Sequence, residues 1–159
     1  MNNTSVGISD WKIESPPKGI ITYALGSCVG IALYDKGKKI AGLSHIMLPE
    51  SKGSGEAVIN RMKFADTAIP DMLAKMVAMG ASKTAIQAKI AGGAVMFKVG
   101  SDRFNIGERN VVAVKAALMA LRIPIIAQDT GKDFGRTMIV DSATGAVTIK
   151  SATKGAWTL

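Results

Sequence analysis

The chain has one cysteine, one histidine and few aromatic residues. A single cysteine among 159 residues excludes an internal disulfide, and a free thiol is typical of a reducing compartment. Aromatic residues make up 5% of the chain, so the core must be built from aliphatic residues and nine methionines. No run of eighteen apolar residues occurs, and the first 17 residues contain no apolar signal segment. The sequence therefore predicts neither secretion nor membrane insertion, and we expect a cytoplasmic protein.

The charge balance is positive, with 20 Lys and Arg against 12 Asp and Glu and a formal net charge of +8. The basic residues are spread singly along the chain, except for Lys36, Lys38 and Lys39. No aromatic stacking positions and no zinc-knuckle spacing accompany them. The sequence therefore argues against nucleic-acid binding. It favours a positive surface that steers an acidic protein partner.

Length and periodicity predict one α+β domain over residues 1–159. Apolar residues at helical spacing predict two main helices, over 61–79 and 107–121, and Pro70 predicts a kink or a break in the first. Apolar and alternating segments predict seven or eight strands, over 5–14, 19–25, 29–34, 40–48, 84–90, 124–128, 136–141 and 146–150. Hairpins at both ends favour helices laid on a mixed or antiparallel sheet over a βαβ series.

The segment over residues 21–49 contains both the lone cysteine, Cys28, and the lone histidine, His45. Two apolar runs flank the polar tetrad 35–38, which predicts a β-hairpin. If the turn is centred on the middle two residues of this tetrad, Cys28 lies opposite His45. Opposed side chains share a face, with Cβ atoms roughly 4.5–5.5 Å apart. A bulged three-residue loop would slip this pairing by one position.

The two faces of the predicted hairpin differ in side-chain size. A core face is predicted for the larger aliphatic residues, Val29, Ile31, Leu33 and Ile40. The other face carries mostly small residues beside the thiol, namely Gly30, Ala32 and Ala41, together with Leu43. Small side chains leave room for another chain to approach, so we expect this second face to receive a partner.

A thiol beside an imidazole forms a nucleophile and its base. The thiolate is the reactive species, and a neighbouring imidazolium stabilises it. Thr22 on the preceding strand is the candidate that orients the imidazole, because its hydroxyl can accept from the ring N–H. Gly26 and Ser27, directly before the cysteine, should allow backbone N–H groups to point at a developing oxyanion. These groups together indicate acyl transfer on an amide or an ester.

Other interpretations of these residues stay open. A buried cysteine is commonly a small hydrophobe, and a lone histidine is commonly a satisfied core residue. One cysteine and one histidine fall short of the usual zinc sets, so no metal is expected, although carboxylates could complete such a set.

Gly92-Gly93 fits no phosphate-binding loop, and we expect it to allow two backbones to approach closely or to make a turn beneath the site. No peptide-binding subsite pattern supports a generic cysteine protease.

Six segments of the chain resemble the family of chemoreceptor glutamine deamidases, CheD. They are TYALGSCVGIALYD, AGLSHIMLP, FADTAIPDML, AKIAGGAVMF, NIGERNV and DTGKDFGR, in the order and spacing of the family over nearly the whole chain. Tyr23 is a mild departure from the family pattern. Residues 49–60 are loop sequence of the variable kind, which leaves the choice of receptor open.

The resemblance implies an enzyme without a cofactor that hydrolyses the side-chain amide of selected glutamines in methyl-accepting chemotaxis receptors to glutamate and ammonia. It implies a catalytic Cys28 and His45, an orienting Thr22 and a thioester intermediate. It also implies a layered α/β/β fold similar to that of a bacterial deamidating toxin. Members of the family can associate with the phosphatase CheC, through the face thought to engage receptors.

A second hypothesis is a signalling adaptor that regulates a CheC-like phosphatase, with catalysis secondary or absent. The presence of all three candidate catalytic residues favours the enzyme. In either case we expect partners to dock around Gly26, Ser27, Gly30 and Ala32, rimmed by the loop 49–60 and by scattered lysines. Gly30→Leu should then weaken receptor and regulator binding together.

Overall fold

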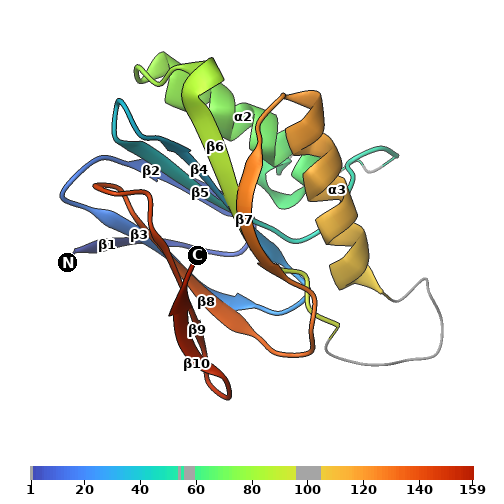
Figure 1. Ribbon diagram of the computed structural model, residues 1–159. Helices are drawn as coiled ribbons and strands as arrows, with labels where there is room; N and C mark the ends of the chain where they lie inside the picture. Colours follow the sequence, from blue (N-terminus) through green and yellow to red (C-terminus); the bar gives the residue numbers. More distant parts are fainter. Residues whose placement is uncertain (1, 54, 56–59, 96–104) are drawn as a thin grey trace.

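The computed structural model describes residues 2–53, 55, 60–95 and 105–159, and it contains three layers (Figure 1). The helices α2 (Ala65–Ala78) and α3 (Ile106–Ala120) cover one face of a five-stranded sheet. The other face of this sheet packs against a second five-stranded sheet. The predicted α/β/β arrangement with two main helices is confirmed, although the described residues form ten strands rather than seven or eight.

Both sheets are mixed. Sheet A has the order β1 (Asn3–Val6), β3 (Gly19–Leu25), β8 (Arg136–Asp141), β9 (Val147–Ser151) and β10 (Gly155–Thr158). Sheet B has the order β2 (Asp10–Glu14), β5 (Ile40–Ile46), β4 (Val29–Asp35), β6 (Ile86–Gly92) and β7 (Ile125–Thr130). The pairs β1–β3 and β6–β7 are parallel, and the other pairs are antiparallel. Two short 3-10 helices, η1 (Arg61–Lys63) and η2 (Lys83–Ala85), precede α2 and β6.

The opening segment differs from the prediction of one strand over residues 5–14. It forms two strands in different sheets, since β1 pairs with β3 and β2 pairs with β5. The chain turns between them at Ser9, which has a positive φ of 60°. The last strand, β10, was not predicted because its four residues show no apolar alternation. It forms by pairing with β9.

A kink or a break was predicted at Pro70, and the break does not occur, because α2 runs through this residue from Ala65 to Ala78. Proline removes one backbone donor from a helix. Ile69 and Met72 on the same helix are fully buried against sheet B. We infer that this packing outweighs the lost hydrogen bond, since tertiary contacts supply most helix stability in proteins.

The core has two parts, one on each face of sheet B. The part between sheet B and the helices contains the predicted core face, Val29, Ile31, Leu33 and Ile40, which is thereby confirmed. The part between the two sheets contains the small-residue face of the hairpin, with Ala32, Ala41 and Leu43, packed against residues of β3, β8 and β9.

The expectation that the small-residue face receives a partner chain is therefore wrong. The chain that approaches it is the second sheet of the same molecule, and both Gly30 and Ala32 are buried there. A Cβ atom added to Gly30 would lie 2.6 Å from Met138 Sδ. Gly30→Leu would consequently disturb the intersheet core and could not report on docking.

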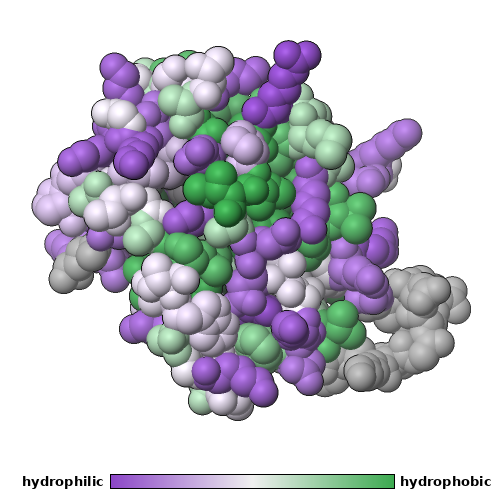
Figure 2. Space-filling view, viewed as in Figure 1, coloured by the Kyte–Doolittle hydropathy of each residue, from purple (hydrophilic) through white to green (hydrophobic). Residues whose placement is uncertain are grey.

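Hydrophilic side chains are spread over the face of the molecule shown in Figure 2, and hydrophobic ones gather near the middle of this view. Ile126 on the edge strand β7 is one of the exposed hydrophobic residues, with 51% of its surface accessible. Within the described residues, neither helix has the length and hydropathy that a membrane crossing requires.

Candidate active site

The lone histidine joins the two sheets. His45 lies on β5 of sheet B and is fully buried. Its Nδ1 atom is 2.7 Å from Oγ1 of Thr22, which lies on β3 of sheet A. Thr22 Oγ1 also donates to the backbone carbonyl of Val6 on β1, at 2.8 Å. The packing of one sheet on the other thus brings together two of the three predicted catalytic residues.

The two hydrogen bonds of Thr22 determine the tautomer of His45. A hydroxyl has a single hydrogen, and the Val6 carbonyl can only accept, so this hydrogen is donated to Val6. The hydroxyl oxygen must then accept from the ring, which places the ring proton on Nδ1. Nε2 is left with a lone pair, and it is buried without a hydrogen-bond partner among the described residues. An imidazole in this form is ready to accept a proton at Nε2.

Burial keeps both the imidazole and the thiol neutral. It lowers the pKa of His45 from 6.5 to about 4. Burial raises the pKa of Cys28, and the backbone N–H of the same residue offsets part of this rise. At neutral pH the resting pair is therefore a thiol and an imidazole. The expected stabilisation of a thiolate by an imidazolium does not describe this resting state.

Cys28 lies in the turn 26–28, where the chain crosses from β3 in sheet A to β4 in sheet B. The side chain is partly buried against the intersheet core. The backbone carbonyls of Gly26 and Cys28 accept from Ala94 and Gly93 at 2.8 Å each. Cys28 Sγ is not hydrogen-bonded to His45, because Nε2 has no partner within the described part of the chain.

The hairpin β4–β5 is confirmed, but its register differs from the prediction by two residues. Gly30, and not Cys28, is the Cα partner of His45. Because side chains alternate with a period of two, a shift of two residues leaves each side chain on its predicted face. Cys28 therefore still lies toward the intersheet side, one residue before β4 begins.

Asp35 explains the longer turn. Its buried carboxylate accepts from the backbone N–H of Lys38 at 3.0 Å and of Ser82 at 2.7 Å. These bonds hold β4 in pairing as far as Asp35, opposite Ile40, so the turn contains four residues, 36–39. Burial alone would raise the pKa of Asp35, but the N–H donors hold this pKa below its ordinary value. Residues 35–38 predicted the turn, but they could not predict the contact with Ser82, which lies 47 residues further along the chain.

Three glycines let the backbone pack tightly beneath Cys28. A Cβ on Gly92 would lie 2.3 Å from the Cys28 carbonyl oxygen, and a Cβ on Gly107 would lie 2.2 Å from the Ala94 carbonyl oxygen. Gly93 donates its N–H to Cys28 and has a positive φ of 66°. The predicted close approach of two backbones at Gly92-Gly93 is confirmed.

One residue at the site was missed by the sequence reasoning. Asn110 of α3 is fully buried, and its Nδ2 atom donates to the carbonyls of Ser27 at 2.9 Å and Met47 at 3.0 Å. The buried residues of α3 are Gly107, Asn110, Val114 and Leu118. A polar residue within this otherwise apolar helical stripe was the available signal.

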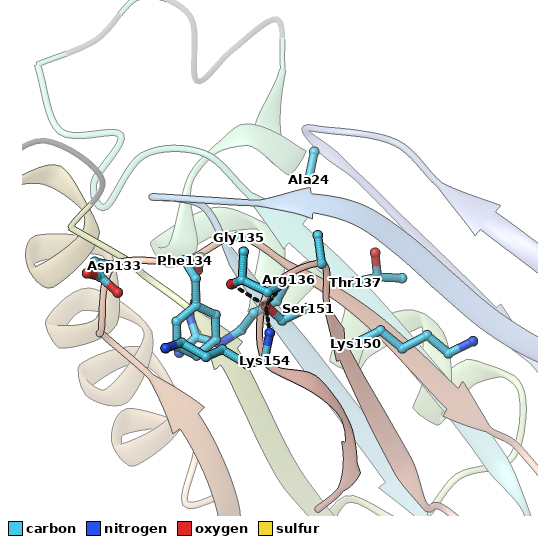
Figure 3. Close-up of a pocket in the computed structure, with 11 residues that line it drawn as sticks. Ala24, Asp133, Phe134, Gly135, Arg136, Thr137, Lys150, Ser151 and Lys154 are labelled. Carbon is cyan, nitrogen blue, oxygen red and sulfur yellow. Dashed lines mark hydrogen bonds between the residues drawn. The ribbon is translucent and has the colours of Figure 1, made fainter.

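A pocket of about 660 Å³ opens at the end of sheet A (Figure 3). Its walls come from Ala24 and from the segments 133–137 and 150–154. Ala24 lies in a bulge of β3 and has a positive φ of 60°. None of the three candidate catalytic residues is among the described residues that line this pocket. The three candidate residues therefore lie outside this pocket.

The described residues contain no cluster of three or more His, Cys, Asp or Glu side chains that could hold a metal ion. Of the predicted substrate contacts, Gly26 and Ser27 are partly exposed in the Cys28 turn, whereas Gly30 is buried between the sheets. The loop 49–60 of the predicted docking rim falls partly outside the described residues.

Fold and site together define a class: an α/β/β protein with a partly exposed thiol and a buried neutral imidazole at one junction of its sheets. Comparison with known proteins is more specific. The family described as CheD, chemotactic sensory transduction, matches residues 47–151. The matched segment begins two residues after His45.

Full-length relatives extend this similarity to most of the chain. A probable chemoreceptor glutamine deamidase CheD from Clostridium botulinum (strain Eklund 17B) is 53% identical over 154 residues, which cover 94% of each chain. Proteins with the same description from Clostridium novyi and Lachnoclostridium phytofermentans are 52% and 47% identical, over 94% of this chain and 93% of each relative. The chain belongs to the CheD family.

Proposed function

We propose that this protein is a cytoplasmic glutamine deamidase that converts selected glutamines of methyl-accepting chemotaxis receptors to glutamate. The names of its relatives, probable chemoreceptor glutamine deamidases, support the activity and the class of substrate. One structural observation carries the mechanism. The Thr22–His45 hydrogen bond orients a neutral imidazole and leaves Nε2 free to take a proton.

In the first half-reaction, Cys28 Sγ attacks the side-chain amide carbon of glutamine, and its proton passes to His45 Nε2. Closure of the thiol onto Nε2 belongs to this step, because the two are not hydrogen-bonded at rest. The amide oxygen becomes an oxyanion beside backbone N–H groups of the Cys28 turn. Collapse of the intermediate breaks the C–N bond, and the proton on His45 leaves with the amine as ammonia.

In the second half-reaction, neutral His45 removes a proton from water, and the resulting nucleophile attacks the thioester carbon. The C–S bond breaks, glutamate is released, and the proton returns to sulfur. Thr22 accepts from Nδ1–H throughout and keeps Nε2 directed at the reacting atoms. No cofactor or metal enters these steps. Gly26 and Ser27, which are partly exposed, remain the proposed contacts to the substrate.

The adaptor hypothesis has no observation in its favour, since the relatives are described as deamidases. Association with a CheC-like phosphatase remains a prediction. Gly30 and Ala32 are buried, so neither a receptor nor a phosphatase can dock on them.

Intact-mass spectrometry of a receptor cytoplasmic fragment tests the proposal. Each deamidation replaces NH₂ by OH and adds about one dalton. We expect wild-type enzyme to add whole steps of this size, and Cys28→Ala to lower the rate by more than about 10³-fold. Circular dichroism of the variant controls for folding. A Cys28→Ala variant as active as the wild type, or a receptor panel left unchanged by the wild type, would refute the deamidase mechanism.

A further inference from the structure

Asn110 connects the two parts of the chain that carry the thiol and the imidazole. Its Nδ2 atom donates one hydrogen to the carbonyl of Ser27, directly before Cys28, and the other to the carbonyl of Met47, two residues after His45. Both partners are carbonyl oxygens, which only accept, so the orientation of the side-chain amide is fixed by its surroundings. A single side chain thereby sets the spacing between the nucleophile turn and the strand of the base.

The contact with Ser27 also sets the direction of a backbone donor. In a trans peptide the C=O and N–H groups point in opposite directions. Since the Ser27 carbonyl points at Asn110, the N–H of Cys28 in the same peptide points away from α3. That N–H interacts with the Cys28 thiol. A donor beside the nucleophilic sulfur is well placed for the oxygen of an amide that the sulfur attacks.

Asn110 lowers the stability of the fold in two ways. Asparagine is a weak helix former in a helix interior, and Asn110 occupies the fifth position of α3. Its Oδ1 atom is buried without a hydrogen-bond partner among the described residues, and such an atom costs about 1–3 kcal/mol. A leucine or alanine would continue the apolar stripe of α3 and remove the unpartnered oxygen, but it would leave the carbonyls of Ser27 and Met47 without this donor. What the amide supplies in return is the pair of hydrogen bonds that joins the Cys28 turn to the end of β5.

We propose that Asn110 is a positioning residue for deamidation, which holds the Cys28 turn so that the Cys28 N–H faces the developing oxyanion. The proposal rests on the deamidase function proposed above and adds a fourth residue to its machinery. Asn110 is fully buried and acts through Ser27 and Met47, without touching the substrate.

Kinetics of Asn110→Ala and Asn110→Asp test the role in turnover. Aspartate preserves the shape but replaces the NH₂ group by an oxygen, which cannot donate to two carbonyls. We expect both variants to lower kcat by about 10–100-fold, as the loss of a supporting residue does, with KM unchanged because the residue is buried. Wild-type turnover in folded Asn110→Asp would overturn the proposal. So would a change confined to KM.

Alkylation by iodoacetamide gives a readout that needs no receptor. Cys28 is the only cysteine in the chain, so the rate reports on one thiol. Rates are compared on the high-pH plateau, where the thiol is fully ionised and the rate reflects its accessibility. We expect Asn110→Ala to react several-fold faster than the wild type because the turn is released. An unchanged plateau rate overturns the inference, whether or not the wild type deamidates a receptor.

Ser142→Ala is the matched control. Ser142 is also fully buried, and its hydroxyl donates to a backbone carbonyl, that of Lys18. This variant should lose comparable stability while kcat and alkylation remain at wild-type values. If neither Asn110 variant folds, the exchange of the Asn110 side-chain amide protons with solvent, measured in the wild type, tests the proposal instead. If the side-chain amide protons of Asn110 exchange as fast as those of exposed Asn2, the proposed positioning role is contradicted. Strong protection of these protons would support it.

Discussion

Two buried polar clusters in this protein differ in whether all of their buried nitrogen atoms have hydrogen-bond partners. In the first, Thr22 and His45 share one hydrogen bond, and Nε2 is left unpartnered among the described residues. In the second, the Arg136 guanidinium donates to Asp129 and to the carbonyls of Gly131 and Phe134. The side chain of Arg136 is completely buried, and its guanidinium lies 4.4 Å from the centre of the Phe134 ring. Phe134 and Arg136 appear together in Figure 3.

The difference separates a structural cluster from the cluster that we propose to be catalytic. Trp157 of β10 donates to the same Asp129 carboxylate at 2.9 Å, so the second cluster ties β7, β8 and β10 together. All of its buried donors have partners within the described residues. The first cluster leaves a basic nitrogen with unused capacity, which is costly for stability and useful for proton transfer. The segment DTGKDFGR, which spans residues 129–136, thus has a structural explanation.

The largest effect is expected when Arg136 is replaced. Arg136→Met leaves the Asp129 carboxylate without its cation, and removal of one partner from a buried ion pair costs about 3–5 kcal/mol. We expect this loss in the free energy of unfolding measured by urea titration. The kcat of the folded fraction should stay at the wild-type value, because Arg136 contributes no group to the reaction.

Lys150→Met is the control for this variant. Lys150 lines the same pocket as Arg136, at the end of sheet A, but it is exposed. A surface change of this kind should alter stability by less than about 0.5 kcal/mol. A large fall in kcat for folded Arg136→Met would show that the second cluster is chemical as well, and would remove the contrast between the two.

The second effect is a loss of stability in acid caused by His45. Its pKa is about 4 in the folded protein and 6.5 in the reference state, so the unfolded chain binds more protons between these values. Stability is therefore fully present above pH 6.5 and falls as the pH is lowered to about 4, by about 3 kcal/mol. Chemical unfolding at several pH values measures this loss.

His45→Gln should remove most of this dependence, because glutamine does not titrate. The difference between the two unfolding curves isolates the histidine from the carboxylates that also titrate in acid. A wild-type curve parallel to that of His45→Gln from pH 6.5 to 4 would mean that the imidazole is not buried in its neutral form.

The smallest effect is expected at Thr22. Thr22→Val preserves the shape of the side chain but leaves Nδ1–H and the Val6 carbonyl without their partner. We expect kcat to fall by about 10–100-fold, measured by the mass assay on a receptor fragment. Thr22→Ser retains the hydroxyl and should restore most of the rate. Nitrogen-15 NMR of the single histidine should show the proton on Nδ1 in the wild type.

Equal turnover of Thr22→Val and the wild type would remove the threonine from the site. A wild-type imidazole protonated on Nε2 would contradict the tautomer that the two hydrogen bonds of Thr22 require. Either result would make the first cluster resemble the second, as a purely structural contact.

The hairpin shows how far local patterns reach. The apolar runs around residues 35–38 predicted both strands and the face of each side chain. They missed the register because the contact between Asp35 and Ser82 depends on a segment 47 residues away. The faces were nevertheless correct, since the shift was by two residues. Asn110 was missed for a similar reason, because its partners Ser27 and Met47 lie 83 and 63 residues away.

By itself, the sequence determined most of the strands, both main helices and the core face of the hairpin, because periodicity and turn chemistry are local. Tertiary structure alone decided that β3 and β4 belong to different sheets. The Thr22–His45 bond therefore crosses the intersheet core. It also decided that Gly30 is covered by Met138. Sheet packing depends on contacts between residues far apart in the chain, and burial between the sheets sets the protonation of the imidazole.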